Sequence, residues 1–331
     1  MVYLYKKALG TKTYYYLRAS TRKKKKILVK DIAYLGSNLE EVQKSLQQMP
    51  KYTEQIRKAY KTIHAFLESN HYLEKAKLLK PKKDPFLKEK LSEVEACKLH
   101  YLLKFNREPE QTKQEILKNF VVEFTFNTTS IEGNTLSLQQ ARNLLQEGIT
   151  PKDKDLREIY DMQNTERVFI QLLTSKEGLT HKLIVNIHKE LMQNIDPRVG
   201  YRTTDVHVIR ANFKSTPAPY VLTDMKLLLK WYEKNKTLLH PLVLATLFHH
   251  KFEKIHPFMD GNGRTGRMLL NFILQDFQYP PVIVRKKTRE GYLQALRTAD
   301  SAPLFEASRS YESLVEYVAQ ELIETYWNIF L

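Results

Sequence analysis

The sequence predicts a mainly α-helical protein that begins with a small β-rich segment. From residue 86 onward, apolar residues recur three and four positions apart in one stretch after another, which is the pattern of helices with one buried face. Residues 1–36 instead combine Tyr, Val and Ile on both sides of a turn at Gly10, which is typical of a hairpin followed by a third strand. The charged stretch KPKKDP at 80–85 carries two prolines and separates the two compositions.

These boundaries divide the chain into a small β-rich segment at 1–36, a helical connector at 37–85 and a main helical domain at 86–331. Residues 200–221, GYRTTDVHVIRANFKSTPAPYV, are the exception within the main domain. Glycine and proline punctuate this stretch, and DVHVI alternates polar and apolar side chains as a strand does. We therefore expect a β-hairpin inserted between helices.

Composition indicates a soluble protein with a sizeable core. The 331 residues are 42% hydrophobic and 27% charged, and no run approaches the ~18–20 apolar residues that a membrane helix needs, so no membrane partner is expected. The single cysteine, Cys97, excludes an internal disulfide and a multi-cysteine zinc site, and it suits a cytoplasmic protein. The net charge of +16 fits a lysine-rich solvated surface or attraction to a polyanion, and it names no partner.

The stretch IHPFMDGNGRTGR at 255–267 has the composition of an anion site. Pro257 cannot continue the helix before it without losing a hydrogen bond, so we expect His256 at the end of that helix. The glycine-rich turn that follows leads into a new helix, whose first backbone N–H groups and positive dipole end attract anions. Arg264 and Arg267 lie three positions apart, so both can point from the first turn toward the same anion.

Two further residues of this stretch suit chemistry on a phosphate. Asp260 offers a hard oxygen ligand of the kind that Mg²⁺ takes beside substrate phosphates. His256 is a candidate general base, because its ordinary pKa lies near neutral pH. Together these residues predict nucleophilic attack on a phosphate, a reaction that depends on positioning and charge neutralisation.

The same stretch resembles the motif of Fic-domain proteins, HPF-x-(D/E)-GNGR-x-x-R, and matches it at every fixed position. The resemblance implies a Fic-type helical bundle with a β-hairpin flap over most of the chain from residue 86. Most members of the family transfer AMP from ATP to a hydroxyl of a target protein with the help of Mg²⁺. The implied activity is therefore that of a protein adenylyltransferase (nucleotidyltransferase). Its co-substrate would be ATP, and its substrate an unidentified Ser, Thr or Tyr hydroxyl or the chain itself.

The resemblance also assigns roles residue by residue. His256 would deprotonate the target hydroxyl, and Asp260 would hold Mg²⁺. The implied nucleotide-binding residues are Gly261 and Gly263 through their backbone and Asn262 through its side chain, all at the α-phosphate, and Arg264 and Arg267 at the outer phosphates. The related Doc-type kinases carry lysine where this chain has Gly263, so the intact GNGR favours nucleotidyl transfer over phosphorylation.

A second motif lies upstream, on a helix expected at about 117–133. Thr128, Glu132 and Gly133 resemble the family's inhibitory motif, (S/T)-x-x-x-E-(G/N), and on a helix the first two lie one turn apart on one face. The resemblance implies that Glu132 pairs with Arg267 and so keeps ATP from binding productively. In some members this glutamate also positions a water that removes AMP from the target, so de-AMPylation through Glu132 stays an alternative.

Two weaker features complete the implied site. Residues 200–221 resemble the flap, which would hold a target segment by strand addition, and Val206, Val208 and Ile209 are the strand we expect there. Tyr292 is a further candidate for nucleotide binding, because the helices after the motif wall the adenine pocket in the family.

Residues 1–36 carry ten Lys or Arg and six Tyr. Basic residues interleaved with aromatic ones can bind nucleic acid. Lysines also protect an exposed sheet edge from aggregation, and the segment could instead recruit the target protein. The competing function is therefore a nucleic-acid-binding regulator that carries a Fic domain.

Overall fold

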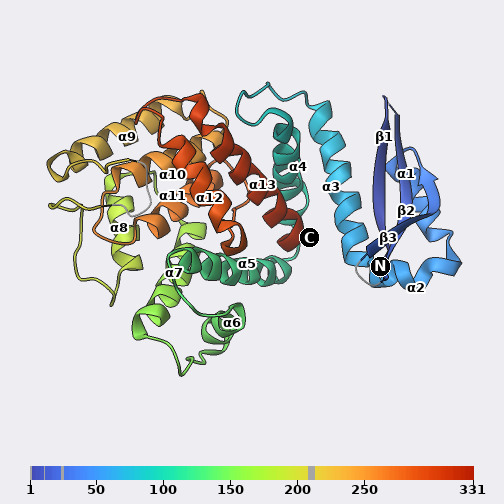
Figure 1. Cartoon of the computed structure of the whole chain (residues 1–331), viewed down its shortest axis with the longest axis horizontal. Coiled ribbons are helices and arrows are strands. Elements are labelled where there is room, and N and C mark those ends of the chain that lie inside the picture. The colour runs from blue at the N-terminus through green and yellow to red at the C-terminus, as the bar shows by residue number, and fades with distance from the viewer. Residues whose placement is uncertain (1, 11, 24–25, 208–212) are drawn as a thin grey trace. The chain divides into compact units, whose positions relative to one another are not determined.

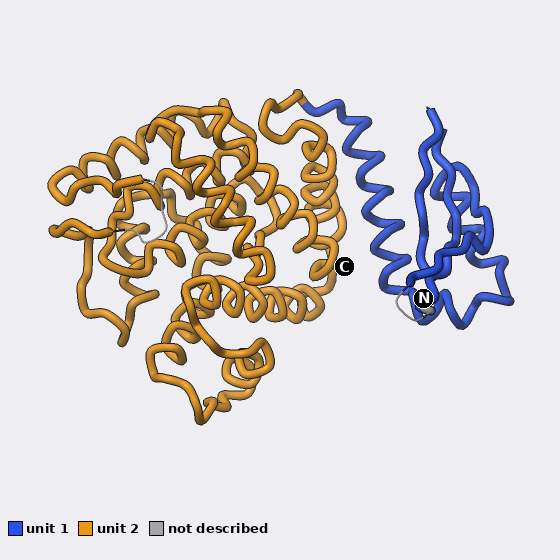
Figure 2. Tube along the Cα trace, viewed as in Figure 1, with its two compact units in different colours: residues 1–81, 331 blue, residues 82–330 orange. Residues whose placement is uncertain are grey.

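The computed structural model describes residues 2–10, 12–23, 26–207 and 213–331. It divides the chain into two compact units, residues 1–81 with Leu331 and residues 82–330 (Figure 2). Each unit has a hydrophobic core of its own.

The first unit is built on a three-stranded antiparallel sheet, so the prediction of a hairpin plus a third strand is confirmed (Figure 1). Its strands are β1 (Val2–Leu9), β2 (Lys12–Lys23) and β3 (Lys26–Gly36), in that order across the sheet. The helices that follow are α1 (Leu39–Gln47), α2 (Thr53–Lys58) and α3 (Tyr60–Leu78). Side chains alternate between the faces of a strand, and one face of this sheet packs against α1 and α3. The core residues on and beneath that face include Val2, Leu4, Tyr15, Leu17, Leu35, Val42 and Ile63.

The second unit is helical, as the apolar spacing predicts. Its helices are α4 (Leu91–Leu103), α5 (Glu110–Ile131), α6 (Leu138–Glu147), α7 (Leu156–Thr174), α8 (His181–Leu191), α9 (Val221–Asn235), α10 (Pro241–Ile255), α11 (Asn262–Asp276), α12 (Arg289–Ala299) and α13 (Glu312–Ile329). Short 3₁₀ turns lie at Pro50–Tyr52 in the first unit and at Lys88–Lys90, Phe105–Arg107, Ala218–Tyr220, Lys286–Thr288 and Arg309–Tyr311 in the second.

Helices α10 and α11 form the centre of the second unit. Most of their residues are buried, and both helices contribute to a single core with α4, α5, α7, α8, α9, α12 and α13. The loop between them, residues 256–261, carries the motif, so two buried helices fix both of its ends. No helix in the part of the chain that the structure describes is long and apolar enough to cross a membrane.

The expected flap falls partly outside the described residues. Val208 and Ile209 lie in the range 208–212 and are not described, and the described residues of 200–221 form no strand. Val206 is half-buried, and its carbonyl accepts a hydrogen bond from the Ser215 hydroxyl at 2.9 Å, which ties the two arms of this segment together. The flap hairpin stays a prediction.

Candidate active site

His256 lies directly after the last turn of α10, in an uncommon backbone conformation. Its φ of 53° and ψ of 60° are left-handed, while its N–H still donates to the Phe252 carbonyl at 2.9 Å. The buried Arg202 side chain holds this conformation, because its Nε donates to the His256 carbonyl at 2.8 Å. The backbone N–H of Arg202 also donates to the Pro257 carbonyl at 2.9 Å. The end of α10 is therefore fixed from outside the helix.

The tautomer of His256 follows from its hydrogen bond. Nδ1 lies 3.2 Å from the Glu253 carbonyl oxygen, and a carbonyl can only accept, so Nδ1 carries the proton. Nε2 then keeps a free lone pair. Burial lowers the pKa of His256 below its ordinary value, which keeps the ring neutral at neutral pH. A neutral imidazole with an unprotonated Nε2 is what a general base needs.

The turn that enters α11 requires glycine at one position. Gly261 has a φ of 74°, and a Cβ there would lie 2.7 Å from the Met192 sulfur. The side chain of Asn262 closes the turn on itself, because its Oδ1 accepts from the Phe258 N–H and its Nδ2 donates to the Phe258 carbonyl, both at 2.9 Å. The Asn262 side chain thus bonds the loop itself, and its expected role at a phosphate stays a prediction. What the turn offers an anion is the set of first-turn N–H groups of α11, which have no partner within the helix.

His188 supports the same turn from α8. Its ring stacks on Phe258 with centroids 3.7 Å apart and planes 3° apart, and its Nε2 donates to the Asp260 carbonyl at 3.0 Å. Burial lowers the pKa of His188 to about 4, so the ring is neutral and its Nδ1 is left without a partner. No local pattern indicates this contact, because a lone histidine on an amphipathic helix is usually an ordinary core residue.

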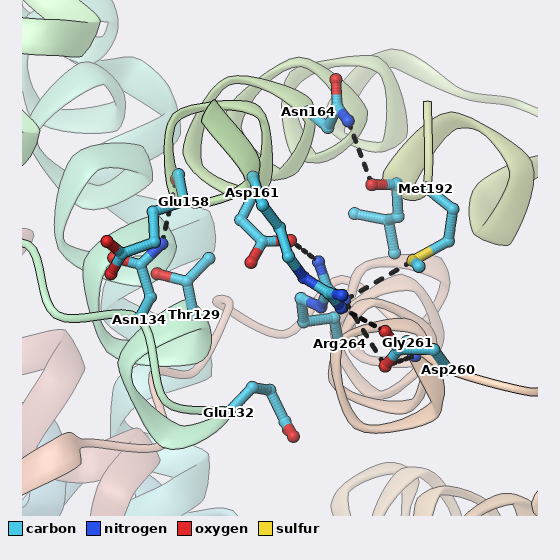
Figure 3. Close-up of polar contacts among 12 residues, drawn as sticks. Thr129, Glu132, Asn134, Glu158, Asp161, Asn164, Met192, Asp260, Gly261 and Arg264 are labelled. Atoms are coloured by element: carbon cyan, nitrogen blue, oxygen red, sulfur yellow. Dashed lines mark hydrogen bonds and ion pairs between the residues drawn. The ribbon is translucent and has the colours of Figure 1, made fainter. Parts of the chain in front are cut away.

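Arg264 makes its contacts with α7 and with the residue that follows α8. It is buried, forms an ion pair with Asp161 of α7, and lies 3.5 Å from the Met192 sulfur (Figure 3). Asp260 lies on the same side, 3.9 Å from the Arg264 guanidinium, and pairs through its other oxygen with Arg157. Burial acts to raise the pKa of Asp260, but the two arginines and the Gly261 N–H outweigh it, so the carboxylate is held ionised.

Arg267 is bound to the end of α5. Its Nε donates to the Thr128 hydroxyl at 2.7 Å, and its Nη2 donates to the Thr128 carbonyl at 3.0 Å and to the Glu132 carboxylate at 2.6 Å. Arg267 is 3% exposed, whereas the Glu132 side chain is 41% exposed. Helix α5 ends at this point because Gly133 follows with a φ of 112°, a value that favours glycine. One turn of helix thus places Thr128 and Glu132 on the same guanidinium.

A cavity of about 210 Å³ opens beside this ion pair. Five of the residues predicted for the site line it: Glu132, His256, Gly263, Arg267 and Tyr292. Four others are not among its described lining residues: Asp260, Gly261, Asn262 and Arg264. Gly263 faces the Glu132 carboxylate so closely that a Cβ would collide with it. Leu293 and Leu296 of α12 add an apolar wall next to Tyr292.

Residues 178–274 match the family model described as the Fic/DOC family. This part of the chain is a Fic/DOC domain. The matched range begins before α8 and ends within α11, so it contains His188, the Arg202 segment and the whole motif loop.

Curated and solved relatives agree with this assignment. Over 208 residues the chain is 35% identical to the protein adenylyltransferase fic-1 of Caenorhabditis elegans, a match that covers 59% of this chain and 41% of that protein. The chain thus spans less than half the length of that relative. A solved structure of C. elegans Fic-1 (residues 134–508) superimposes with a TM-score of 0.59 and 25% identity, covering 88% of this chain and 92% of that one. A Fic-domain signalling protein from Bacteroides thetaiotaomicron shares the fold, with a TM-score of 0.63 and 23% identity over 70% of this chain and 95% of that one.

Glu253 is a residue of the Fic/DOC site that the sequence did not reveal. It lines the cavity one turn before His256, and its Oε1 is buried without a hydrogen-bond partner. The nearest histidine nitrogen, Nδ1 of His249, lies 4.0 Å away and is also unpartnered, while Nε2 of His249 bonds the Tyr292 hydroxyl at 2.5 Å. Burial, opposed only in part by Arg267, raises the pKa of Glu253 to about 8. In the sequence it is one polar residue of an amphipathic helix.

The described residues contain no cluster of three or more His, Cys, Asp or Glu side chains that could hold a metal by itself. The motif loop offers Mg²⁺ the ionised carboxylate of Asp260, which is 40% exposed. Mg²⁺ commonly binds one or two protein carboxylates together with substrate phosphates and water. The donor set therefore fits a metal ion that binds together with a nucleotide.

Proposed function

We propose that this chain is a protein adenylyltransferase that transfers AMP from ATP to a Ser, Thr or Tyr hydroxyl of a target protein, under restraint by Glu132. One observation carries the proposal: His256 and Arg267 line the same cavity, and that arginine is already paired with Glu132. The likeness to a protein named adenylyltransferase supports the reaction class.

The proposed reaction uses groups whose positions are described above. Nε2 of His256 accepts the proton of the target hydroxyl, the hydroxyl oxygen bonds to the α-phosphorus of ATP, and the bond to pyrophosphate breaks. The first-turn N–H groups of α11 stabilise the charge on the α-phosphate. Asp260 would hold Mg²⁺, which supplies further neutralisation of phosphate charge. Arg157 must leave Asp260 for that, and its side chain is 58% exposed.

The proposed restraint acts through Arg267. A buried guanidinium is a strong, bidentate partner for a γ-phosphate, but here its donors face Thr128 and Glu132. ATP can take up Arg267 only when the Glu132 carboxylate leaves. Because that side chain is 41% exposed, the carboxylate can move into water. Removing it frees Arg267 without leaving a cavity in the hydrophobic core.

The experiment compares ATP labelled on the α-phosphate with ATP labelled on the γ-phosphate, each with Mg²⁺ and with and without cell lysate. Wild type, Glu132→Gly and Glu132→Gly with His256→Ala run side by side. His64→Ala, a change on α3 of the first unit, serves as the matched histidine control. We expect transfer of the α-label alone, raised at least tenfold by Glu132→Gly, abolished by His256→Ala and unchanged by His64→Ala.

Other outcomes assign other functions. Transfer of the γ-label would show a kinase and would contradict the proposal. If no label is transferred, the next experiment incubates the chain with a target protein that already carries AMP. Loss of AMP from that target with wild type, but not with Glu132→Gly, would show that the cavity serves removal of AMP through Glu132.

A further inference from the structure

The sheet of the first unit has a second face that none of the functions above explains. Strand alternation places the side chains of five tyrosines on it, and we call this surface the tyrosine face: Tyr3, Tyr5, Tyr14, Tyr16 and Tyr34. None of the five belongs to the core cluster formed with α1 and α3, whereas Tyr15, which points to the opposite face, is 1% exposed and does. Tyr34 is 53% exposed and the other four are half-buried, so these rings stay partly accessible to a ligand although they lie outside the core, and their presence together calls for an explanation.

The tyrosines of this face lie next to one another across the strands. Tyr16 of β2 is paired in register with Tyr5 of β1 on one side and with Tyr34 of β3 on the other. The ring centroids of Tyr16 and Tyr34 are 5.5 Å apart, and those of Tyr14 and Tyr34 are 6.3 Å apart. The Arg18 guanidinium lies 3.2 Å from the centroid of the Tyr5 ring. The face therefore carries aromatic rings on all three strands, and those of β2 and β3 contact one another.

The segment that carries this face has an excess of positive charge. Residues 1–36 contain ten Lys or Arg against one acidic residue, which gives a net charge of +9. That one acid, Asp31, already forms an ion pair with Arg18. Lys7 and Arg22 lie on the strand positions that share the tyrosine face, and both are exposed. A ligand that satisfies both features must carry repeated negative charge and flat apolar surfaces.

We propose that the tyrosine face binds single-stranded nucleic acid, with bases stacked on the tyrosine rings and phosphates beside the surrounding lysines and arginines. In a duplex the base faces are covered by their neighbours, so a duplex can satisfy the positive charge but not the rings. An acidic protein surface likewise satisfies the positive charge but offers no flat apolar groups to the rings. The proposal depends only on the first unit and is independent of the function proposed for the Fic/DOC domain.

The test measures binding of the full-length chain by fluorescence anisotropy, with a labelled 20-nucleotide oligo(dT) and a random-sequence duplex of equal length. Tyr16→Ala combined with Tyr34→Ala removes two neighbouring rings. Tyr60→Ala removes a tyrosine of α3 that is 64% exposed and lies outside the face, and it serves as the control. We expect the single strand to bind at least tenfold more tightly than the duplex. The double variant should weaken single-strand binding by roughly tenfold or more, because one lost stacking partner costs ~5- to 150-fold. The control should bind as wild type does.

Tyr16→Phe with Tyr34→Phe keeps both rings and distinguishes lost stacking from lost folding. This variant should bind the single strand as tightly as wild type does. Lys7→Gln should weaken the binding of the single strand and of the duplex by the same factor, and it should reduce the dependence of both affinities on salt. Equal binding of both ligands with no effect of the tyrosine changes would overturn the proposal, and so would preference for the duplex or no binding at 50 mM salt.

Discussion

Replacing Arg202 with alanine should be among the most damaging single changes in the second unit. Its guanidinium is fully buried and donates to four backbone carbonyls: Nε to His256 at 2.8 Å, Nη1 to Thr204 at 2.9 Å, and Nη2 to Thr216 and, at 3.4 Å, to Ile255. These carbonyls belong to two segments, the end of α10 and the loop that carries the expected flap. One side chain thus joins the candidate general base to the segment beside it.

The size of the effect follows from these contacts. A hydrogen bond from a charged donor contributes about 1.5–3 kcal/mol. Counting the three short bonds of Arg202 at the lower value and neglecting the long one, we expect Arg202→Ala to lower the free energy of unfolding by about 4.5 kcal/mol. Lysine keeps the charge but not the planar fork, so Arg202→Lys should recover only part of this loss. Both variants also release the left-handed backbone of His256, so AMP transfer should fall by at least tenfold.

The assay is urea unfolding followed by tryptophan fluorescence. Both tryptophans, Trp231 and Trp327, lie in the second unit, so their signal reports that unit alone. Arg198→Ala is the matched control, because Arg198 lies in the same connecting segment but is 58% exposed and pairs with the neighbouring Asp196. Its unfolding midpoint should not change measurably. If the free energy of unfolding of Arg202→Ala lies within about 1 kcal/mol of that of wild type, or its unfolding midpoint is no lower than that of Arg198→Ala, the hydrogen bonds of Arg202 do not stabilise the site.

Three further changes test other parts of the site. Gly261→Ala should destabilise the second unit by about 1–3 kcal/mol, measured by the same unfolding assay, because its left-handed φ and the sulfur of Met192 leave no room for a Cβ. Glu253 has a folded pKa of about 8 against 4.5 in the unfolded chain, so the folded state binds more protons and loses stability as pH rises between these values. Glu253→Gln should remove that loss, and its melting temperature should exceed that of wild type at pH 9 but not at pH 4. Arg157→Ala frees the Asp260 carboxylate, so in the Glu132→Gly background half-maximal AMP transfer should need less Mg²⁺; an unchanged Mg²⁺ requirement would argue against Asp260 as the ligand.

Sequence patterns were sufficient for the helices and the sheet, because amphipathic spacing and strand alternation depend on neighbours within a few residues. Glycine in the motif could likewise be interpreted locally, since Gly261 occupies the left-handed position that begins α11. The partners of the charged residues were not predictable in this way. Asp161 lies 103 positions before Arg264, and Arg202 lies 54 positions before His256. Nothing in the local pattern distinguishes such contacts from surface charges.

The role of Asn262 shows the same limit inside the motif itself. Its type and position suit a phosphate ligand, but both ends of its amide bond the backbone of Phe258. An amide can satisfy a backbone N–H and C=O at once, and the left-handed turn at Gly261 brings the Asn262 side chain to those two groups of Phe258. The side chain therefore shapes the loop, and the helix N-terminus supplies the N–H groups.

The ion pairs of the site differ in a way that assigns them different tasks. Arg264 and Asp161 are 3% and 13% exposed, so separating them leaves charge in the core, which is strongly unfavourable. Glu132 and Arg157 are 41% and 58% exposed, and each can move into water when its partner takes up another ligand. A polyphosphate with its metal ion is therefore expected to displace these two exposed side chains and to leave Arg264 with Asp161. The buried pair is therefore a fixed part of the scaffold, and the affinity for nucleotide is expected to depend on how readily Glu132 and Arg157 leave their partners.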